Sequence, residues 1–407
     1  MSAKPPHMKP VIVIGGGVAG ITASLDLARA GTAVHLVEKG PALGGQVSAL
    51  DKLYPTDHCA FCPLWTEVRN CMLNPLITVH TCAEINTITK TDGALKVVVD
   101  EHPRYIDENR CISCGRCVPA CGVDAISTLG AHAYPPSYYI YREKCTLCGK
   151  CVDVCPTSAI DINRKAASSE ILARDVIWAT GFQDYDISPL EEYGYGTHPD
   201  IMSSLQFEEW TAESGLNRGT VVKKQDNKQP ASIAFIQCAG ARDLRLFPYC
   251  SAVCCMHALK QAQWVKRRNP QVQCVIFFTD MRAEGRHYYE YYLREIGGSS
   301  IELLRGRPGL IYPMPDEDGI AVKYENTITQ SRQIRKFDMV VLNGALQPSL
   351  AKSKDSGYSP ILDTEGLLSG ISPTIKSCGF CREPMDVEAS VVQASSAALR
   401  VHVGEEQ

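Results

Sequence analysis

Two runs of closely spaced cysteines carry the clearest chemistry in this 407-residue sequence. Each run is spaced Cys-x2-Cys-x2-Cys-x3-Cys, and the second run ends in a Cys-Pro pair. With this spacing, three thiolates of a run bind one [4Fe–4S] cluster and the fourth thiolate reaches the other cluster. Zinc ribbons or free thiols explain the doubled pattern less well. The two expected ligand sets are Cys111, Cys114, Cys117 and Cys155, and Cys145, Cys148, Cys151 and Cys121.

A further group of four cysteines follows the pattern Cys238-x11-Cys250-x3-Cys254-Cys255. We expect a helix over residues 250–268, on which Cys250 and Cys254 share a face because they are four residues apart. Cys238 lies at the end of an expected strand, where it provides a fourth ligand. Spacing alone leaves two interpretations open, a third [4Fe–4S] cluster and buried structural cysteines.

The elements that position a dinucleotide are expected near the N-terminus. Residues 11–14 are Val-Ile-Val-Ile, which is typical of a buried parallel strand, and they lead directly into Gly15-x-Gly17-x-x-Gly20. A helix-like segment follows, and the next apolar strand ends at Glu38. In this order Gly15 forms the tight turn, Gly17 lets the backbone approach a pyrophosphate, and Gly20 lets helix and strand pack closely. Glu38 is expected to bind the ribose hydroxyls.

The sequence around this site resembles the thioredoxin-reductase-like flavoproteins. Glu38-Lys39 followed by Gly44-Gly45 is similar to the FAD-binding entry of that family. The strand and turn at 177–182 are similar to those by which the family returns to its flavin domain. The resemblance implies that the nucleotide is FAD. The further contacts it implies are Lys39, Gly44, Gly45, Thr180 and Gly181.

Nearly the whole chain is similar to the A subunit of heterodisulfide reductase. The similarity rests on Gln-Cys-x-Gly-x-Arg-Asp at 237–243, on Cys-Ser-x-Val-Cys-Cys-Met at 250–256 and on the flavin-closing end at 378–387. It implies a third cluster on the second cysteine group. The usual flavin-closing Gly-Asp is here Gly379-Phe380, and Asp386 is the expected substitute for the missing carboxylate. Many members also carry an extra N-terminal domain and a C-terminal ferredoxin unit, which we do not find in these residues.

A second nucleotide-binding unit is expected to lack its glycine cradle. Residues 225–230 form a polar linker, and a buried strand then begins where a pyridine-nucleotide flavoenzyme starts its second βαβ unit. The chain continues Gln-Cys-Ala-Gly-Ala-Arg, in which only Gly240 remains of a fingerprint. We therefore expect no NAD(P)H site there.

These segments predict an α/β protein with two Rossmann-like, thioredoxin-reductase-like domains and an inserted α+β ferredoxin domain of the bacterial type. The flavin motifs lie on both sides of the two cysteine runs, so the insertion interrupts the flavin domain. The expected boundaries are 1–104 and 164–230 for two parts of the FAD domain and a linker, 105–163 for the ferredoxin domain, 231–345 for the second nucleotide-like domain, and 346–407 for the C-terminal part of the FAD domain.

Other cysteines have open roles: Cys59, Cys62, Cys71, Cys82, Cys378 and Cys381. The pair Cys59-x2-Cys62 has three interpretations, which are a dithiol beside the flavin, part of a further cluster with Cys71 and Cys82, and structural thiols. In a form of the second interpretation, cysteines of another subunit supply the remaining ligands of that cluster. For Cys378-x2-Cys381, packing is favoured over contact with the flavin or a partner.

The composition is that of a globular protein, with 45% hydrophobic and 21% charged residues. Lys and Arg total 41 against 45 Asp and Glu, and this near balance gives no general attraction to nucleic acid or to an anionic membrane. We see no signal peptide and no membrane span. A cytoplasmic protein is therefore expected, whose cysteines bind metals or do redox chemistry.

The combined expectation is a FAD- and [4Fe–4S]-containing electron-transfer subunit of a heterodisulfide-reductase-like oxidoreductase complex, with no catalytic side chain beyond the cofactors. The resemblance to the heterodisulfide reductase A subunit also implies flavin-based electron bifurcation. Its implied partners are B- and C-like heterodisulfide reductase subunits, a hydrogenase-associated [2Fe–2S] subunit or a quinone-linked membrane subunit, with a homodimer of this chain inside the larger complex. The alternatives are a self-contained NAD(P)H-dependent iron–sulfur flavoprotein similar to the glutamate synthase small subunit, and a non-catalytic scaffold.

Overall fold

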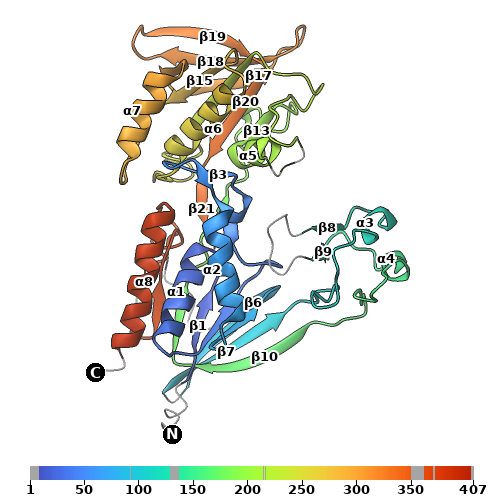
Figure 1. The fold of residues 1–407 in the computed structure, drawn as a ribbon. Coiled ribbons are helices and arrows are strands. Elements are labelled where there is room, and N and C mark those ends of the chain that lie inside the picture. The colour runs from blue at the N-terminus through green and yellow to red at the C-terminus, as the bar shows by residue number, and fades with distance from the viewer. Residues whose placement is uncertain are drawn as a thin grey trace.

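The computed structural model describes residues 9–91, 93–128, 137–213, 215, 217–349, 362–369 and 372–404. Within these ranges the chain forms two α/β bodies, one above the other, and an arm that projects sideways from the lower body (Figure 1). The predicted α/β class is confirmed.

The lower body is built on a five-stranded parallel sheet in the order β22-β11-β1-β2-β5. Its strands are β1 (Val11–Ile14), β2 (Val34–Val37), β5 (Ile77–His80), β11 (Asp175–Trp178) and β22 (Ile375–Ser377). One face packs against the helices α1 (Val18–Arg29), α2 (Phe61–Leu73) and α8 (Val387–Val403). The other packs against the antiparallel strands β6 (Ala83–Thr91), β7 (Ala94–Glu101) and β10 (Ala167–Ala173). Because both faces are covered, every residue of β1 is buried, which explains its unbroken apolar run.

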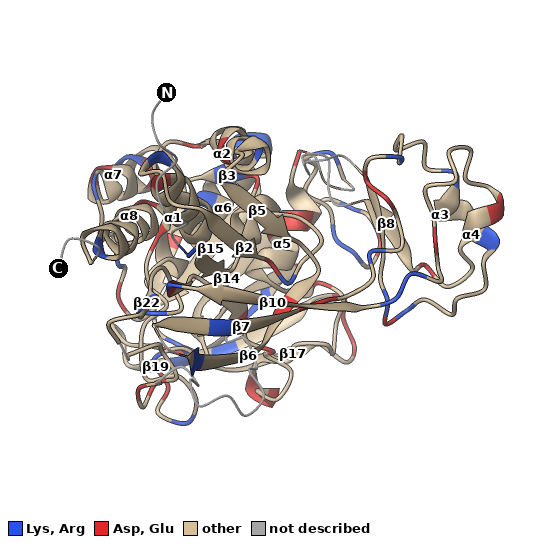
Figure 2. Ribbon diagram, turned by 90° about the horizontal axis from the view of Figure 1, so that it is seen from below, with Lys and Arg blue, Asp and Glu red and all other residues tan. Residues whose placement is uncertain are grey.

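The arm leaves the lower body after β7 and returns at β10, and these two strands are antiparallel neighbours. It contains α3 (Cys117–Ala120), β8 (Ile126–Thr128), β9 (Tyr138–Ile140) and α4 (Lys150–Asp153). Figure 2 shows the arm standing clear of both bodies, with α3 and α4 at its far end. An insertion between neighbouring strands leaves the pairing of the parallel sheet intact.

The upper body has a parallel sheet in the order β13-β20-β14-β15-β16. Its strands are β13 (Ile201–Ser203), β14 (Ser232–Ala239), β15 (Gln273–Phe278), β16 (Ile301–Arg305) and β20 (Met339–Gly344). The helices α5 (Ser204–Thr211), α6 (Cys254–Arg268) and α7 (Tyr288–Gly298) pack on one face. The antiparallel strands β17 (Pro308–Pro313), β18 (Ile320–Asn326) and β19 (Ser331–Phe337) pack on the other.

Two sequence-based assignments in the upper body are wrong. Residues 201–211 were expected in the flavin domain, but β13 pairs in parallel with β20 and α5 packs beside it, so the upper body begins before residue 231. The helix expected over 250–268 begins only at Cys254. The backbone of Ala252 has φ +64°, in the left-handed region that an α-helix cannot contain.

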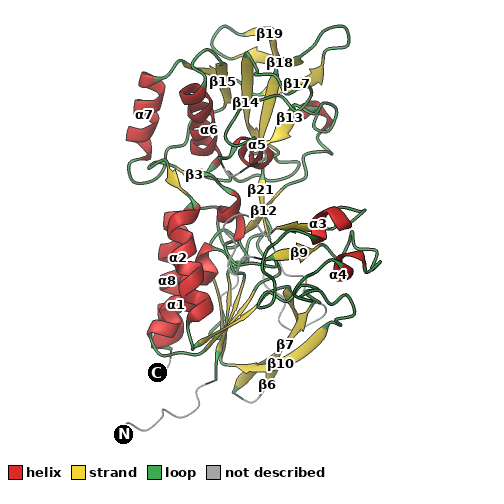
Figure 3. Ribbon diagram, turned by 45° about the vertical axis from the view of Figure 1, so that its right-hand side comes forward, coloured by secondary structure: helices red, strands yellow, loops and turns green. Residues whose placement is uncertain are grey.

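The bodies are joined by the antiparallel pair of β12 (Phe182–Asp184) and β21 (Leu346–Pro348). A hairpin of the lower body, β3 (Lys52–Leu53) and β4 (His58–Cys59), also lies between them, below α6 (Figure 3). The short 3-10 helices η1 (Gly45–Ala49) and η2 (Glu191–Tyr193) complete the described elements.

Candidate cofactor sites

The glycine turn after β1 has the shape of a phosphate cradle. Gly15 has φ +106°, and a Cβ atom there would lie 2.3 Å from the Ala179 carbonyl oxygen. A Cβ on Gly20 would lie 1.8 Å from the Gly15 carbonyl oxygen, so helix and strand meet without room for a side chain. A Cβ on Gly17 would meet only the Gly45 Cα, at 3.8 Å. The space in front of Gly17 is thus open, at the N-terminus of a helix that has no side-chain cap.

Glu38 lies next to this cradle at the end of β2. Its carboxylate accepts hydrogen bonds from the backbone N–H groups of Gly16 at 2.6 Å and Gly40 at 2.5 Å. Burial raises the pKa of Glu38, and these two hydrogen bonds oppose the rise. Lys39, by contrast, is largely exposed and pairs with Glu84 at 3.3 Å. The geometry therefore fits a ribose contact for Glu38 and places Lys39 on the surface.

The other residues expected to bind the flavin surround the same helix N-terminus. A Cβ on Gly45 would lie 2.8 Å from the Gly17 Cα, and one on Gly379 would lie 2.9 Å from the Ala19 Cβ. Gly44 is the N-cap of η1, with φ +125°. Thr180 and Gly181 follow β11, and the Thr180 Cα would lie 3.0 Å from a Cβ on Gly15. The fold thus gathers these predicted contacts, while their role in binding stays a prediction.

Asp386 lies at the N-cap of α8, and its carboxylate already has two partners. It accepts a hydrogen bond from the Ala389 N–H at 2.8 Å and another from the Tyr288 hydroxyl at 2.5 Å. Tyr288 belongs to α7, so this contact joins the flavin-closing helix to the upper body. The substitute role that the resemblance implies for Asp386 stays a prediction.

Six of the eight cysteines of the arm belong to one small core, and the other two, Cys114 and Cys148, are exposed. Burial raises the pKa of Cys117 to about 11, a backbone hydrogen bond opposes the rise, and the thiols of Cys111, Cys151 and Cys114 add to it in turn. Burial also raises the pKa of Cys151, and the neighbouring thiols of Cys145, Cys148 and, from the first run, Cys121 raise it further. The approach of Cys121 to the second run is what the expected crossover of ligands requires.

The fourth cysteines of the two runs have matching hydrogen bonds. The backbone N–H of Ala125 donates to the Cys121 sulfur at 3.3 Å, and the N–H of Ala159 donates to the Cys155 sulfur at 3.3 Å. Burial would raise the pKa of Cys155, but its backbone hydrogen bonds lower it. Hydrogen bonds to ligand sulfurs tune the reduction potential of a cluster.

The second cysteine group gathers at the carboxyl end of β14. Burial raises the pKa of the Cys254 thiol, and so do Cys238, Cys255 and Cys250 in turn. Cys250 likewise raises the pKa of Cys238 and of Cys255, and Cys238 raises the pKa of Cys255. All four thiols are therefore mutual neighbours. Cys250 joins them from the loop before α6 and not from a shared helix face.

Cys238 reaches this group through an irregular backbone. Its φ is +59°, and the pairing of β14 with β20 shifts register between Ile236 and Ala239. Among the described residues, no three or more His, Cys, Asp or Glu side chains converge on a point that would hold a single metal ion. A cluster has different demands, since each thiolate binds its own iron at a separate corner of the cube.

The loop after β14 is filled by protein where a second nucleotide would bind. The Arg307 guanidinium donates to the carbonyl oxygens of Cys238 and Ala241. A Cβ on Gly240 would meet the Leu190 side chain at 3.3 Å. This loop therefore offers no open cradle of the kind found at Gly17.

Two tyrosines bridge the cysteine group and the lower body. The ring of Tyr54, in the β3–β4 hairpin, meets the Tyr288 ring edge-on at a centroid distance of 5.2 Å. Burial raises the pKa of Tyr54, and its other charged neighbours include Asp386 and Cys254. The aromatic pair thus fills the space between the N-terminus of α8 and the first turn of α6.

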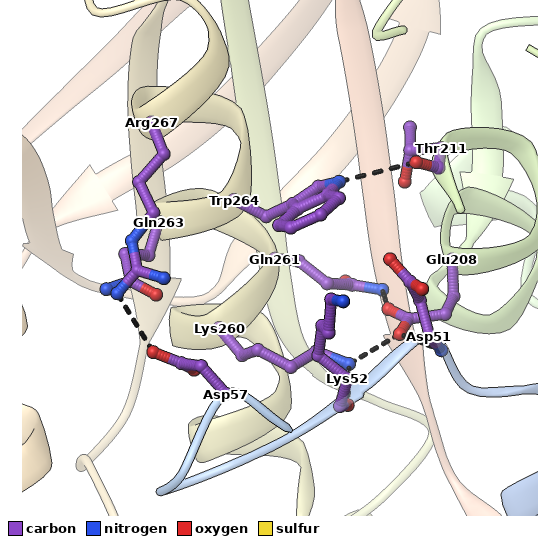
Figure 4. Close-up of a pocket in the computed structure, with 10 residues that line it drawn as sticks. All are labelled: Asp51, Lys52, Asp57, Glu208, Thr211, Lys260, Gln261, Gln263, Trp264 and Arg267. Carbon is purple, nitrogen blue, oxygen red and sulfur yellow. Dashed lines mark hydrogen bonds and ion pairs between the residues drawn. The ribbon is translucent and has the colours of Figure 1, made fainter. Parts of the chain in front are cut away.

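A buried ion pair fixes the same hairpin to the upper body (Figure 4). The Lys260 ammonium on α6 donates to Glu208 on α5 at 2.5 Å and to the Lys52 carbonyl oxygen at 2.9 Å. Glu208 also accepts the Asp51 N–H at 3.0 Å. Glu208 is 4% exposed and Lys260 is 5% exposed, and the cavity beside them, about 30 Å³, is large enough only for water.

Sequence reasoning missed Tyr54, Glu208, Lys260 and Tyr288, which lie where the two bodies meet, and Arg307, whose partners belong to the upper body. None of them belongs to a local motif, because their partners lie far away in the sequence. The sequence does hold one signal, the aromatic run at 287–292. Tyr288 and Tyr291 of that run are indeed buried.

Two family models match the chain in the places where the cradle and the arm lie. Residues 10–62 match a model described as FAD dependent oxidoreductase, and residues 104–162 match a 4Fe-4S dicluster domain. The chain is thus similar to FAD-binding oxidoreductases and to dicluster ferredoxins in those segments.

Curated relatives match almost the entire chain. It is 37% identical to the second iron–sulfur A subunit of CoB–CoM heterodisulfide reductase from Methanopyrus kandleri, over 96% of this chain and 63% of that protein. It is 35% identical to the A subunit of the H2/formate:CoB–CoM heterodisulfide, ferredoxin reductase from Methanococcus maripaludis, over 97% of this chain and 64% of that protein. The chain therefore spans a little under two thirds of the length of these relatives.

Solved structures share the fold at low sequence identity. Thioredoxin reductase of T. acidophilum aligns with a TM-score of 0.56 and 14% identity, over 99% of this chain and all of that one. Thioredoxin reductase of Lactococcus lactis aligns equally well, over 97% of this chain and 98% of that one. The predicted thioredoxin-reductase-like fold is confirmed. No helix within the described residues is long and apolar enough to cross a membrane.

Proposed function

We propose that this chain, a homologue of the A subunits of heterodisulfide reductase over nearly its whole length, is the electron-transferring flavin and iron–sulfur subunit of a heterodisulfide-reductase-like complex. It would hold one FAD, two [4Fe–4S] clusters in the arm and a third cluster in the upper body. When bound, FAD exchanges electrons in pairs or singly, and each cluster carries one electron.

One observation carries this proposal. The chain carries an open cradle at Gly17 together with two separate groups of neighbouring thiols, one in the arm and one beside α6, and this combination supports the proposal. A branched electron path needs two routes by which electrons leave one flavin. We therefore propose more specifically that this subunit takes part in flavin-based electron bifurcation. The NAD(P)H-dependent alternative lacks support because Arg307 fills the loop that would bind the nicotinamide dinucleotide.

The residues of this chain have distinct tasks in this function. The N–H groups at the start of α1 bind the pyrophosphate, and Glu38 fixes the ribose. The backbone N–H groups of Ala125 and Ala159 stabilise the negative charge on the ligand sulfurs. Burial and Cys250 raise the pKa of Cys238, and Arg242 and Arg307 oppose this rise, which helps the thiolate form that binds iron.

Native purification of the tagged chain under anaerobic conditions tests this function. We expect it to co-purify with other redox subunits, among them a disulfide-reducing, hydrogenase-linked or quinone-linked chain, and these partners should reduce or oxidise its flavin. A chain that purifies alone and whose flavin NADH reduces rapidly would contradict the proposal and favour the self-contained flavoprotein.

A further inference from the structure

The pair Cys59 and Cys62 is not used by the proposed function, and its geometry suits a disulfide. Cys59 ends β4, and Cys62 lies in the first turn of α2. The N-cap residue between them, Ala60, has helical dihedral angles, so the two cysteines are related as i and i+3 of one helical turn. Residues so related have Cβ atoms about 5–6 Å apart. A small shift brings them to the separation of about 3.5–4.5 Å that a disulfide needs.

The two sulfurs differ in access and in chemistry. Cys62 is exposed, whereas Cys59 is partly buried against the core below α2. The Cys59 sulfur accepts hydrogen bonds from the Cys62 thiol and from the N–H groups of Phe61 and Cys62. Burial would raise the pKa of Cys59, but these hydrogen bonds and the Lys52 ammonium, on the paired strand, lower it. Helix N-termini favour cysteine thiolates in this way.

The other cysteines nearby are not placed to share a cluster with this pair. Cys71 lies nine residues after Cys62 on the same helix, a rise of about 13 Å. It is fully buried, and burial raises its pKa to about 12. Cys82 is buried beside Arg104 and Tyr139, at the base of the arm. The pair therefore stands by itself at the surface.

We propose that Cys59 and Cys62 form a reversible disulfide that exchanges with an external thiol at the exposed Cys62 sulfur. In the oxidised protein, an incoming thiolate attacks the Cys62 sulfur, the bond between Cys62 and Cys59 breaks, and Cys59 leaves as a thiolate. A second external thiolate then attacks the external sulfur of the mixed disulfide, the bond from that sulfur to Cys62 breaks, and Cys62 leaves as a thiolate. The products are one external disulfide and the reduced Cys59–Cys62 pair, so that two electrons and two protons pass from two thiols to the protein.

The hydrogen bonds of Cys59 give this exchange its direction. A leaving thiolate with a low pKa departs faster, so attack at Cys62 is favoured. Stabilisation of the Cys59 thiolate also stabilises the reduced pair, which makes its disulfide easier to reduce than a buried structural disulfide. The site is thus an acceptor for electrons from thiols, on the same hairpin that contacts α6.

Equilibration of the anaerobically purified full-length protein with glutathione tests the proposal. After incubation at a series of ratios of reduced to oxidised glutathione, differential alkylation and mass spectrometry report the state of each cysteine. We expect wild type to form the Cys59–Cys62 disulfide, and Cys59→Ser to accumulate a glutathione adduct on Cys62. Cys71→Ala, on the same helix, is the matched control and should exchange like wild type.

The outcomes separate the competing roles of the pair. If glutathione reduces the disulfide, its reductant is a small thiol. If only a protein dithiol such as thioredoxin reduces it, its reductant is a protein partner. A wild-type pair that stays reduced at every ratio overturns the proposal without any variant. A loss of about four iron atoms per chain in Cys59→Ser also overturns it, because the residue would then be a cluster ligand.

Discussion

The buried ion pair between Glu208 and Lys260 should anchor the hairpin to the upper body, because its two members bind the Asp51 N–H and the Lys52 carbonyl oxygen. Replacing Lys260 with Met leaves the Glu208 carboxylate buried without its ammonium partner, and its remaining partners are the Asp51 N–H at 3.0 Å, the Gln261 amide at 3.0 Å and His257 at 3.3 Å. Removing one member of a buried ion pair costs about 3–5 kcal/mol of unfolding free energy. For a body of this size that corresponds to a fall in melting temperature of roughly 10 °C.

The pH dependence of the variant should have the opposite sign to that of wild type. Burial alone would raise the pKa of Glu208, but Lys260 and His257 outweigh it and hold the pKa below its ordinary value of 4.5. This group therefore stabilises wild type above that pH, and its contribution is lost as the pH falls. In Lys260→Met burial prevails, the pKa rises, and acid relieves the buried charge. The difference in unfolding free energy between wild type and Lys260→Met should therefore become smaller as the pH decreases.

Anaerobic thermal unfolding, followed by tryptophan fluorescence, measures both effects, since Trp264 lines the cavity beside the pair. The matched control is Lys228→Met, which removes an exposed lysine paired with Asp226 at 3.2 Å and should cost less than about 1 kcal/mol. The double variant Glu208→Gln, Lys260→Met should regain much of the loss. If Lys260→Met unfolds like Lys228→Met, the pair is not the buried link described above.

Two further predictions concern the nucleotide sites. Gly17→Ala should fold, because its Cβ would meet only Gly45 at 3.8 Å, but it should bind FAD poorly because that Cβ collides with the pyrophosphate. Gly20→Ala should misfold, and circular dichroism and flavin content distinguish the two variants. A Gly17→Ala protein with full flavin would show that the site is misplaced. The isolated protein should be reduced by dithionite but not by NADH or NADPH at a catalytically useful rate, and rapid flavin bleaching by either nicotinamide would refute the filled loop at Arg307.

Local chemistry was visible in the sequence where a motif is contiguous. The turn from Gly15 to Gly20 was predictable because a Cβ on Gly20 would collide with Gly15 of the same turn, whereas the close approach of Ala179 to Gly15 joins strands that are distant in sequence. The approach of Cys121 to the second run agrees with the crossover that the spacing predicts, while the ligand sets stay a prediction. In both cases the residue types and their separation already specify the contact.

Contacts that depend on distant pairing were not predictable. The strand at 201–203 escaped recognition because its partner, β20, lies more than a hundred residues later. The start of α6 was misplaced because the left-handed backbone at Ala252 has no signature in an alanine. The pair of Glu208 and Lys260 arises where two helices meet a hairpin from the other body, and neither residue type indicates burial.

Iron and flavin content, measured on the same anaerobically purified sample, tests the central claim most directly. Wild type should contain about twelve iron atoms per FAD, and Cys254→Ser about eight, with one electron paramagnetic resonance signal lost and the coupled pair of the arm retained. Cys274→Ala, a buried cysteine on β15 of the same sheet, should keep all the iron. Unchanged iron and an unchanged spectrum in well-folded Cys254→Ser would contradict the third cluster and leave the upper body without an electron carrier.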